Sequence, residues 1–180
     1  MMGRGSGPVV RLAVVLVGVI LGVVAMTGCR PGSGEEEAQE QGLRDSRDQT
    51  VTELTAALDT VTAGLPAQLR FSQGNYDTCR SDLRGATGYA YSVNGRLDLA
   101  VAPTRADLTR LAGLLTQAGF EAEVVDEATV RGTKDDLTLR LSRLDQEPAY
   151  LFSGGTDECF GIGRDRAGDY SVDKDPIQLG

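Results

Sequence analysis

The sequence predicts an α+β fold, in which an N-terminal helix and a second helix pack on one face of a mainly antiparallel sheet. Apolar residues recur at helical spacing in two segments, residues 45–63 and 104–119. Several short runs, separated by turn residues, instead alternate between apolar and polar side chains. The resulting order is helix, hairpin, helix and then a meander of strands, which is typical of an α+β domain.

The first predicted helix runs from about Asp45 to Ala63 and ends at Gly64 and Pro66. Its apolar positions form a narrow stripe: Val51, Leu54, Leu58, Val61 and Leu65. Such a stripe favours packing against the sheet, and pairing with a partner helix in a coiled coil is the alternative.

A hairpin is predicted around Asn94-Gly95, because alternating residues lie on both sides of this dipeptide. A single long strand with a bulge at Gly95 fits the same alternation and stays an alternative. The preceding polar segment, residues 70–88, predicts only a short strand or a turn. Aromatic residues of the predicted strands are interpreted as core rather than as an exposed binding patch: Tyr89, Tyr91, Phe152 and Phe160.

The second predicted helix opens at Thr104, which forms a capping-box pattern with Asp107, and it ends at Gly119. Four extended runs follow it, at residues 121–125, 129–132, 137–144 and 149–153. In the third run, leucines alternate with Thr138, Arg140 and Ser142, so one face of that strand is buried and the other is wet.

The N-terminal segment has the pattern of an export signal. Arg4 and Arg11 precede an apolar run of 15 residues, Leu12–Met26, which is shorter than the roughly 20 residues that span a bilayer. The run ends in Met26-Thr27-Gly28-Cys29, which resembles the lipobox of bacterial lipoproteins. That resemblance implies cleavage before Cys29 and a diacylglyceryl group on its thiol. The alternative is a plain membrane anchor in which Cys29 is incidental.

The chain has three cysteines, and lipidation of Cys29 leaves Cys79 and Cys159 as a pair. We expect a disulfide between these two, because disulfides persist outside the cytoplasm. A redox or nucleophilic thiol is disfavoured, since the chain lacks a Cys-x-x-Cys spacing and has no histidine to lower a thiol pKa.

Four parts of the chain are predicted from these patterns. Residues 1–28 form the signal peptide, residues 29–44 the lipidated cysteine and an acidic flexible tether, residues 45–160 a single α+β domain, and residues 161–180 a loosely attached polar tail. The tether is expected to be coil because it is rich in Gly and Glu. Its glutamates would be repelled by an anionic lipid surface and hold the domain off the membrane: Glu35, Glu36, Glu37 and Glu40.

Composition excludes several classes of function. With 26 acidic against 18 basic residues and a formal charge of −8, the chain has no basic stripe for nucleic acid. The absence of histidine removes histidine-based nucleophile pairs, a histidine general base and histidine zinc sites. No cofactor is predicted.

The remaining chemical motifs predict no catalytic or metal-ligating residue. Carboxylates at Asp135-Asp136 and at Asp157-Glu158 are adjacent in sequence, so their side chains diverge on an extended chain. The two lysines, Lys134 and Lys174, lie outside a Ser-x-x-Lys context. Gly161-Ile162-Gly163 lacks the third glycine of a phosphate loop. The aspartates of the tail do not match an EF-hand loop, and weak calcium binding there stays open: Asp165, Asp169, Asp173 and Asp175.

The layout resembles the LppA-like family of small actinobacterial lipoproteins. The resemblance rests on the lipobox cysteine, the helical segment after it, Cys79, the Thr104–Gly119 helix with its preceding strand, and the ending Phe152–Phe160. The excess of Arg over Lys, 16 against 2, is also typical of a GC-rich actinobacterial genome. The resemblance implies an envelope location and a compact α+β domain, and it transfers no activity and no functional residue.

The function predicted from the sequence is that of a non-enzymatic binding or accessory module, held on the extracytoplasmic face of the membrane by acylated Cys29. Its expected partner is an envelope protein or a wall or lipid component. One alternative is a carboxylate-dependent hydrolase of cell-wall glycan, and another is a structural envelope lipoprotein with no specific ligand.

Overall fold

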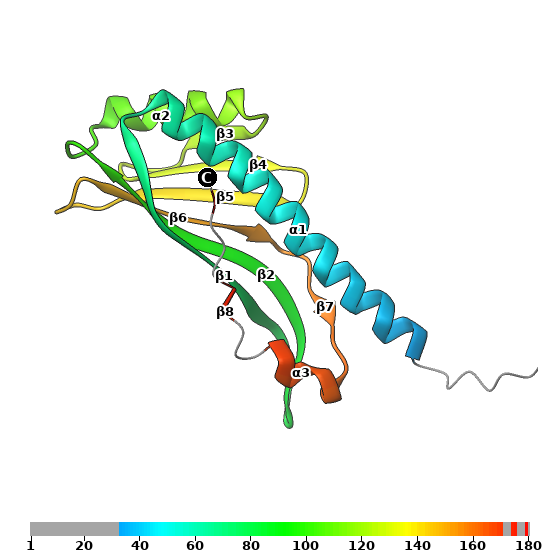
Figure 1. Cartoon of the computed structure of the whole chain (residues 1–180). Coiled ribbons are helices and arrows are strands. Elements are labelled where there is room, and N and C mark those ends of the chain that lie inside the picture. The colour runs from blue at the N-terminus through cyan, green and yellow to red at the C-terminus, as the bar shows by residue number, and fades with distance from the viewer. Residues whose placement is uncertain (1–32, 171–173, 176–178, 180) are drawn as a thin grey trace, which may run out of the picture. The chain divides into compact units, whose positions relative to one another are not determined.

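The computed structural model describes residues 33–170, 174–175 and 179 (Figure 1). The predicted α+β fold is confirmed within these residues. The helices are α1 (Ser33–Gly64), α2 (Arg105–Gln117) and α3 (Arg164–Tyr170). The strands are β1 (Ala67–Asp82), β2 (Gly85–Leu99), β3 (Glu121–Val124), β4 (Thr129–Lys134), β5 (Leu137–Arg143), β6 (Ala149–Thr156), β7 (Phe160–Gly161) and β8 (Lys174–Asp175).

All strands belong to one antiparallel sheet in the order β3-β4-β5-β6-β2-β1-β8. The long strand β2 pairs with β1 along one edge, and along the other edge it pairs first with β7 and then with β6. The sheet therefore continues from the meander of β3–β6 into a long two-stranded hairpin. Figure 1 shows that hairpin extending away from the meander toward α3.

The prediction of a hairpin turn at Asn94-Gly95 is wrong, because both residues lie inside the continuous strand β2. The alternative of one long strand is confirmed, although the shifts in its register with β1 lie between Leu69 and Phe71 and on both sides of Arg80. Close packing explains why position 95 is a glycine, because a Cβ there would lie 2.3 Å from Phe152 Cζ and 2.5 Å from the carbonyl oxygen of Phe71.

The chain turns instead at Leu83-Arg84, in the polar segment for which only a short strand or a turn is predicted. Asp82 and Gly85 are paired across this turn, and Gly85 has a φ of +126°. The strand before this turn is exposed from Asp77 to Asp82, so its side chains do not alternate between buried and exposed positions. That explains why the sequence pattern does not indicate a strand of this length.

The prediction of a flexible tether through Arg44 is wrong for the described part of that range, because α1 begins at Ser33. Leu43 is fully buried, and Gly42 lies so close to the ring of Phe160 that a Cβ would approach Phe160 Cε1 to 2.6 Å. These contacts come from segments far along the chain. Tertiary packing therefore holds the helix around Gly42 and Leu43, although the composition of this segment favours coil.

The prediction of a loose tail from residue 161 is also wrong for the residues described. α3 carries Tyr170, which is 9% exposed, and Leu179 is 1% exposed. β8 pairs with β1 at Gly74 and Asn75. The C-terminal segment is thus part of the packed structure at the positions described.

The core lies between the helices and one face of the sheet. The predicted apolar stripe of α1 is buried within the chain, which confirms core packing over a coiled coil: Leu54, Leu58, Val61 and Leu65. α2 contributes its own buried leucines, which are Leu108, Leu111, Leu114 and Leu115. The aromatic residues predicted as core are also buried: Tyr89, Tyr91, Phe152 and Phe160.

The second helix and its caps are confirmed. Asp107 Oδ2 accepts a hydrogen bond from the backbone N–H of Thr104 at 2.7 Å, and the Thr104 hydroxyl accepts from the backbone N–H of Asp107. The Thr104 hydroxyl also donates to Asp107 Oδ2 at 2.7 Å, and the bonds that this carboxylate accepts from the backbone N–H and the hydroxyl of Thr104 lower the pKa of Asp107, because they favour its charged form. Gly119 follows the helix with a φ of +90°.

The predicted disulfide is confirmed between Cys79 and Cys159, whose Cα atoms lie 5.9 Å apart. It joins the exposed half of β1 to the segment directly before β7. The thiol of Cys29 and the apolar segment before it lie outside the described residues. Among the helices of the described residues, none has the length and apolar content needed to cross a membrane.

Candidate functional site

The face of the sheet opposite the core is the candidate functional site. The core side of β2 and β5 is formed by alternate residues that pack under the helices, such as Tyr91, Val93, Leu139 and Leu141. The residues between them point to the other face, where no helix of the described chain lies (Figure 1). We call this surface the open face.

The open face consists of three rows of residues, two of which run across six strands, from β3 to β1, and one across five, from β4 to β1. The central row, in cross-strand register, is Glu123, Arg131, Arg140, Ser153, Asn94 and Gln73. The row on one side is Thr129, Ser142, Leu151, Arg96 and Phe71. The row on the other side is Glu121, Thr133, Thr138, Gly155, Ser92 and Asn75. Hydroxyl and amide side chains therefore dominate this surface.

Two adjoining hollows lie on the open face, and we call them together the groove. The first hollow is lined by Phe71, Asn94, Gly95, Arg140, Ser142, Leu151, Phe152 and Ser153. The second is lined by Ser92, Thr138, Arg140, Ser153, Gly154, Gly155, Thr156 and Asp157. Arg140 and Ser153 line both hollows, so they mark the centre of the groove.

Arg140 differs from the other arginines of the open face. Arg131, its cross-strand neighbour on β4, is paired with Glu123. Arg96 is paired with two carboxylates, Asp98 and Glu147, each at 2.6 Å, and these bonds raise the pKa of Arg96. The guanidinium of Arg140 is exposed and forms neither an ion pair nor a hydrogen bond with any residue that the structure describes.

One wall of the groove is apolar. Phe71 is 52% exposed and Leu151 is 43% exposed, and they flank Arg96 in the same cross-strand row. Three strand spacings separate the strand of Phe71 from the strand of Arg140, which corresponds to about 14 Å. The groove thus presents a cation at its centre and an aromatic ring toward one end.

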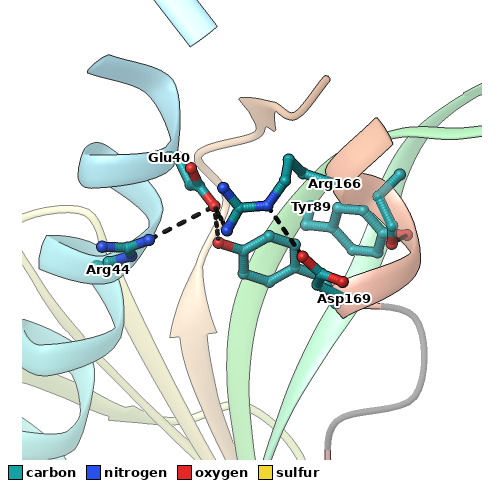
Figure 2. A network of polar contacts seen from close by, with 7 residues as sticks. Glu40, Arg44, Tyr89, Arg166 and Asp169 are labelled. Atoms are coloured by element: carbon teal, nitrogen blue, oxygen red, sulfur yellow. Dashed lines mark hydrogen bonds and ion pairs between the residues drawn. The ribbon is translucent and has the colours of Figure 1, made fainter. Parts of the chain in front are cut away.

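A second polar region lies on the covered side, where α1 meets α3 (Figure 2). We call it the Glu40 cluster, which consists of Glu40, Arg44, Arg166, Asp169 and Tyr170. The carboxylate oxygen Oε1 of Glu40 accepts a hydrogen bond from the Tyr170 hydroxyl at 2.6 Å and lies 2.8 Å from Nη2 of Arg166 and 3.5 Å from Nη2 of Arg44. Asp169 pairs with Nε of Arg166 at 2.9 Å.

The electrostatics of the Glu40 cluster are those of a structural contact. Burial raises the pKa of Tyr170, and its hydrogen bond to Glu40 raises the pKa further because it favours the protonated hydroxyl. The carboxylates of Asp169 and Glu40 raise the pKa of Arg166. Each charge in the cluster thus has an opposite charge beside it, and the cluster joins α1 to α3.

The carboxylate pairs singled out from the sequence are not brought together by the fold. Asp135 and Asp136 are exposed in the turn between β4 and β5, and Asp157 and Glu158 are exposed after β6. Asp157 also lines the groove. Within the described residues, no group of three acidic or cysteine side chains is close enough to hold a metal ion.

The other charged residues considered in the sequence are placed as follows. Nζ of Lys134 lies 2.5 Å from Oε2 of Glu53 and 6.0 Å from the ring centre of Phe120. Asp165 is exposed on α3, and Asp169 belongs to the Glu40 cluster. Asp173 lies outside the described residues. The side chain of Asp175 also lies outside what the structure describes, so weak calcium binding by the tail stays a prediction.

The groove is the feature that sequence reasoning missed. The alternation of Thr138, Arg140 and Ser142 indicates a wet strand face, and that part is confirmed by their exposure. What a single strand cannot indicate is which residues of other strands stand beside Arg140. Ser153 and Asn94 lie in the same cross-strand row as Arg140 because of the register of β5, β6 and β2.

Comparisons with protein-family models, with curated proteins and with solved structures find no match to this chain. The fold and the open face are thus the features from which a function can be argued. Together they define an α+β domain with a helix-covered face and a polar, grooved open face.

Proposed function

We propose that this protein is a lipid-anchored lipoprotein on the extracytoplasmic face of the cell membrane. In this proposal it is a non-enzymatic binding module of the envelope, and its ligand binds in the groove. The proposed location is supported by the lipobox-like sequence Met26–Cys29 and by the disulfide between Cys79 and Cys159, which is typical of proteins outside the cytoplasm.

The observation that carries the binding proposal is the position of Arg140. In an acidic chain, carboxylates pair with the arginines on both sides of it, at Arg131 and Arg96. Arg140 has no such partner among the described residues and stands where the two hollows meet. An unpaired guanidinium in a hollow is a ready binding group for an anionic ligand.

Binding is favoured over glycan hydrolysis by the residues that line the groove. Hydrolysis of a glycosidic bond usually requires two carboxyl groups about 5–10 Å apart on opposite sides of the bond. Asp157 is the single carboxylate among the described residues that line the two hollows. The groove therefore has the groups to hold an anion but lacks the usual acid–base pair.

The start of α1 sets how far such a domain would lie from its anchor. Ser33, the first residue of α1, follows Cys29 by four residues, and four residues span at most about 14 Å. The first turns of the helix carry the exposed carboxylates of Glu35, Glu36 and Glu37. An anionic lipid surface would repel these carboxylates, which favours a domain held off the membrane surface.

Membrane attachment can be tested with Cys29→Ser in the producing bacterium. We expect the wild-type chain in the membrane fraction, labelled by a clickable palmitate analogue, and we expect the variant to lose both the label and the membrane association. Arg140→Gln is the matched control, since it should stay labelled and membrane-bound. An unlabelled wild-type chain, or a Cys29→Ser chain that stays in the membrane, would refute the lipoprotein proposal.

Use of the groove can be tested in the same cells with a photo-crosslinking residue at Ser153, in the centre of the groove. The control position is Ala56, which is exposed on α1. We expect adducts with an envelope component from position 153 and not from position 56, and loss of these adducts when Arg140→Gln is added. Equal adducts from both positions would contradict a binding role for the groove.

A further inference from the structure

We propose that the ligand of the groove is a short oligosaccharide that carries a carboxylate. In this proposal Arg140 holds the carboxylate, the hydroxyl and amide side chains of the groove bind the sugar hydroxyls, and the ring of Phe71 packs against a sugar face. The inference rests on the proposed function, because it names the ligand class of the same groove.

The charge of the groove points to a carboxylate. A guanidinium is planar and donates two parallel hydrogen bonds to a carboxylate. No described residue accepts a hydrogen bond from the guanidinium of Arg140. Arg131 stands directly opposite Arg140 in the adjacent strand, and like charges at such positions repel each other. Arg131 already has Glu123 as its counter-ion, so an anionic ligand would neutralise the charge of Arg140, whereas a neutral ligand would not.

The polar lining of the groove matches sugar hydroxyls. Hydroxyl side chains both donate and accept hydrogen bonds, as do the hydroxyls of a sugar. Within the described chain, the side chains of Ser153, Thr138 and Asn94 form no hydrogen bond, so their capacity is free for a ligand. Ser142 is bonded to Thr129 at 3.1 Å and keeps one further site, since a hydroxyl has one donor and two acceptor positions.

The apolar part of the groove is too small for a protein partner. A standard protein interface buries about 800 Å² on each side around an apolar centre. The groove offers two large exposed apolar side chains, Phe71 and Leu151. One aromatic ring beside polar groups suits the C–H face of a pyranose ring, which is flat and weakly apolar.

A peptide ligand is also disfavoured by the position of the groove. Extended peptides usually bind a sheet by adding a strand at an edge, where backbone groups are unpaired. Apart from Phe71 on β1, the groove instead lies on β5, β6 and β2, each of which is paired with a strand on both sides. It therefore offers side chains alone, and it crosses the strands over the roughly 14 Å between Arg140 and Phe71.

The proposal can be tested by titrating the full chain, in detergent micelles, with two disaccharides that differ in one carboxylate. The acidic probe is N-acetylglucosaminyl-N-acetylmuramic acid, whose lactyl group carries the carboxylate, and the neutral probe is di-N-acetylchitobiose. We expect calorimetry to give about tenfold tighter binding of the acidic probe, the size of one charge-assisted contact. Equal binding of the two probes, or binding of neither, would overturn the proposal.

Three variants locate the binding within the groove. Arg140→Gln should remove the preference for the acidic probe, whereas Phe71→Ala should weaken both probes by a similar factor. Arg131→Gln is the matched control, since it removes an arginine from the same row that is already paired with Glu123, and it should leave the preference in place. An unchanged preference in Arg140→Gln would refute the role of that residue.

The outcome separates this inference from the proposed function. If Cys29→Ser leaves the membrane and position 153 still crosslinks to an envelope protein while neither sugar binds, the glycan inference fails and the binding module stands. If the acidic sugar binds but the chain carries no lipid, the ligand class stands and the proposed location fails.

Discussion

The Glu40 cluster and the groove place charged side chains in opposite situations. Glu40 is 13% exposed and has three partners, which are Tyr170, Arg166 and Arg44. Arg140 is exposed and has none within the described residues, although it stands in a row with Arg131 and opposite Ser153. The first arrangement holds two helices together, and the second leaves a cation free for an outside ligand.

The difference teaches which charges matter for stability and which for recognition. A charge at a half-buried contact is costly to leave unpaired, so loss of one partner destabilises the fold. An exposed charge without a partner contributes little to folding. Substitutions in the cluster should therefore reduce stability without changing groove binding, and substitutions at Arg140 should do the reverse.

The largest effect is expected from removing the disulfide, which lies at the end of the molecule that holds the Glu40 cluster. The double variant Cys79→Ser, Cys159→Ser opens a loop of 80 residues. Loop entropy gives about 4.5 kcal/mol as an upper value, and a loss of about 2–4 kcal/mol is expected in urea unfolding. Hydrogen exchange should rise more in α3 than in β5, and an even rise would contradict this division.

Glu40→Gln should lower the free energy of unfolding by about 1–3 kcal/mol, because Arg166 and Tyr170 lose a charged partner. Urea unfolding measures the loss. Glu35→Gln is the matched control, since Glu35 is exposed in the first turn of the same helix, and it should change stability by less than about 0.5 kcal/mol. Equal effects of the two variants would mean that the cluster does not stabilise the fold.

Tyr150→Phe tests a buried polar group that, unlike Glu40, has no partner. The Tyr150 side chain is fully buried, and its hydroxyl has no hydrogen-bond partner among the described residues. Burial raises the pKa of Tyr150 to about 12, and the nearby charge of Asp107 adds to this shift. At pH 7 the variant should be as stable as the wild type or more stable by up to about 1 kcal/mol.

The pH dependence of Tyr150 has a definite sign. Because its pKa is higher in the folded chain than the ordinary value of about 10, the unfolded chain ionises first as the pH rises. The wild type should therefore lose about 1.4 kcal/mol from this residue between pH 8 and pH 11, and Tyr150→Phe should lack that share of the loss. Parallel pH profiles of the two proteins would refute this.

Arg140→Gln should have the smallest effect on stability, within about 0.5 kcal/mol of the wild type, because the side chain is exposed and unpaired in the described structure. A slight gain is expected from relief of the repulsion by Arg131. Thermal and urea unfolding measure this. A loss above 1 kcal/mol would show that Arg140 has a structural role and would remove the contrast with Glu40.

Much of the fold could be predicted because its signals are local. The helix at Thr104–Gly119 is specified by its cap residues and its leucine spacing, and the meander by alternation within short runs. The errors occur where a distant segment decides the outcome. Asn94-Gly95 has the composition of a turn, but the close approach of Phe152 is what the glycine accommodates.

The sequence by itself determined the α+β class, the second helix with both ends, the short strands and the pairing of Cys79 with Cys159. It also contains the lipobox-like motif on which the proposed location depends. Only the tertiary structure decided that the helix starts at Ser33, that the tail packs, and that Arg140, Ser153 and Asn94 form one row. The reason is physical: caps and periodicity act over a few residues, whereas strand register joins separate segments such as those of Asn94 and Ser153, and the burial of Glu40 depends on Tyr170, 130 residues away.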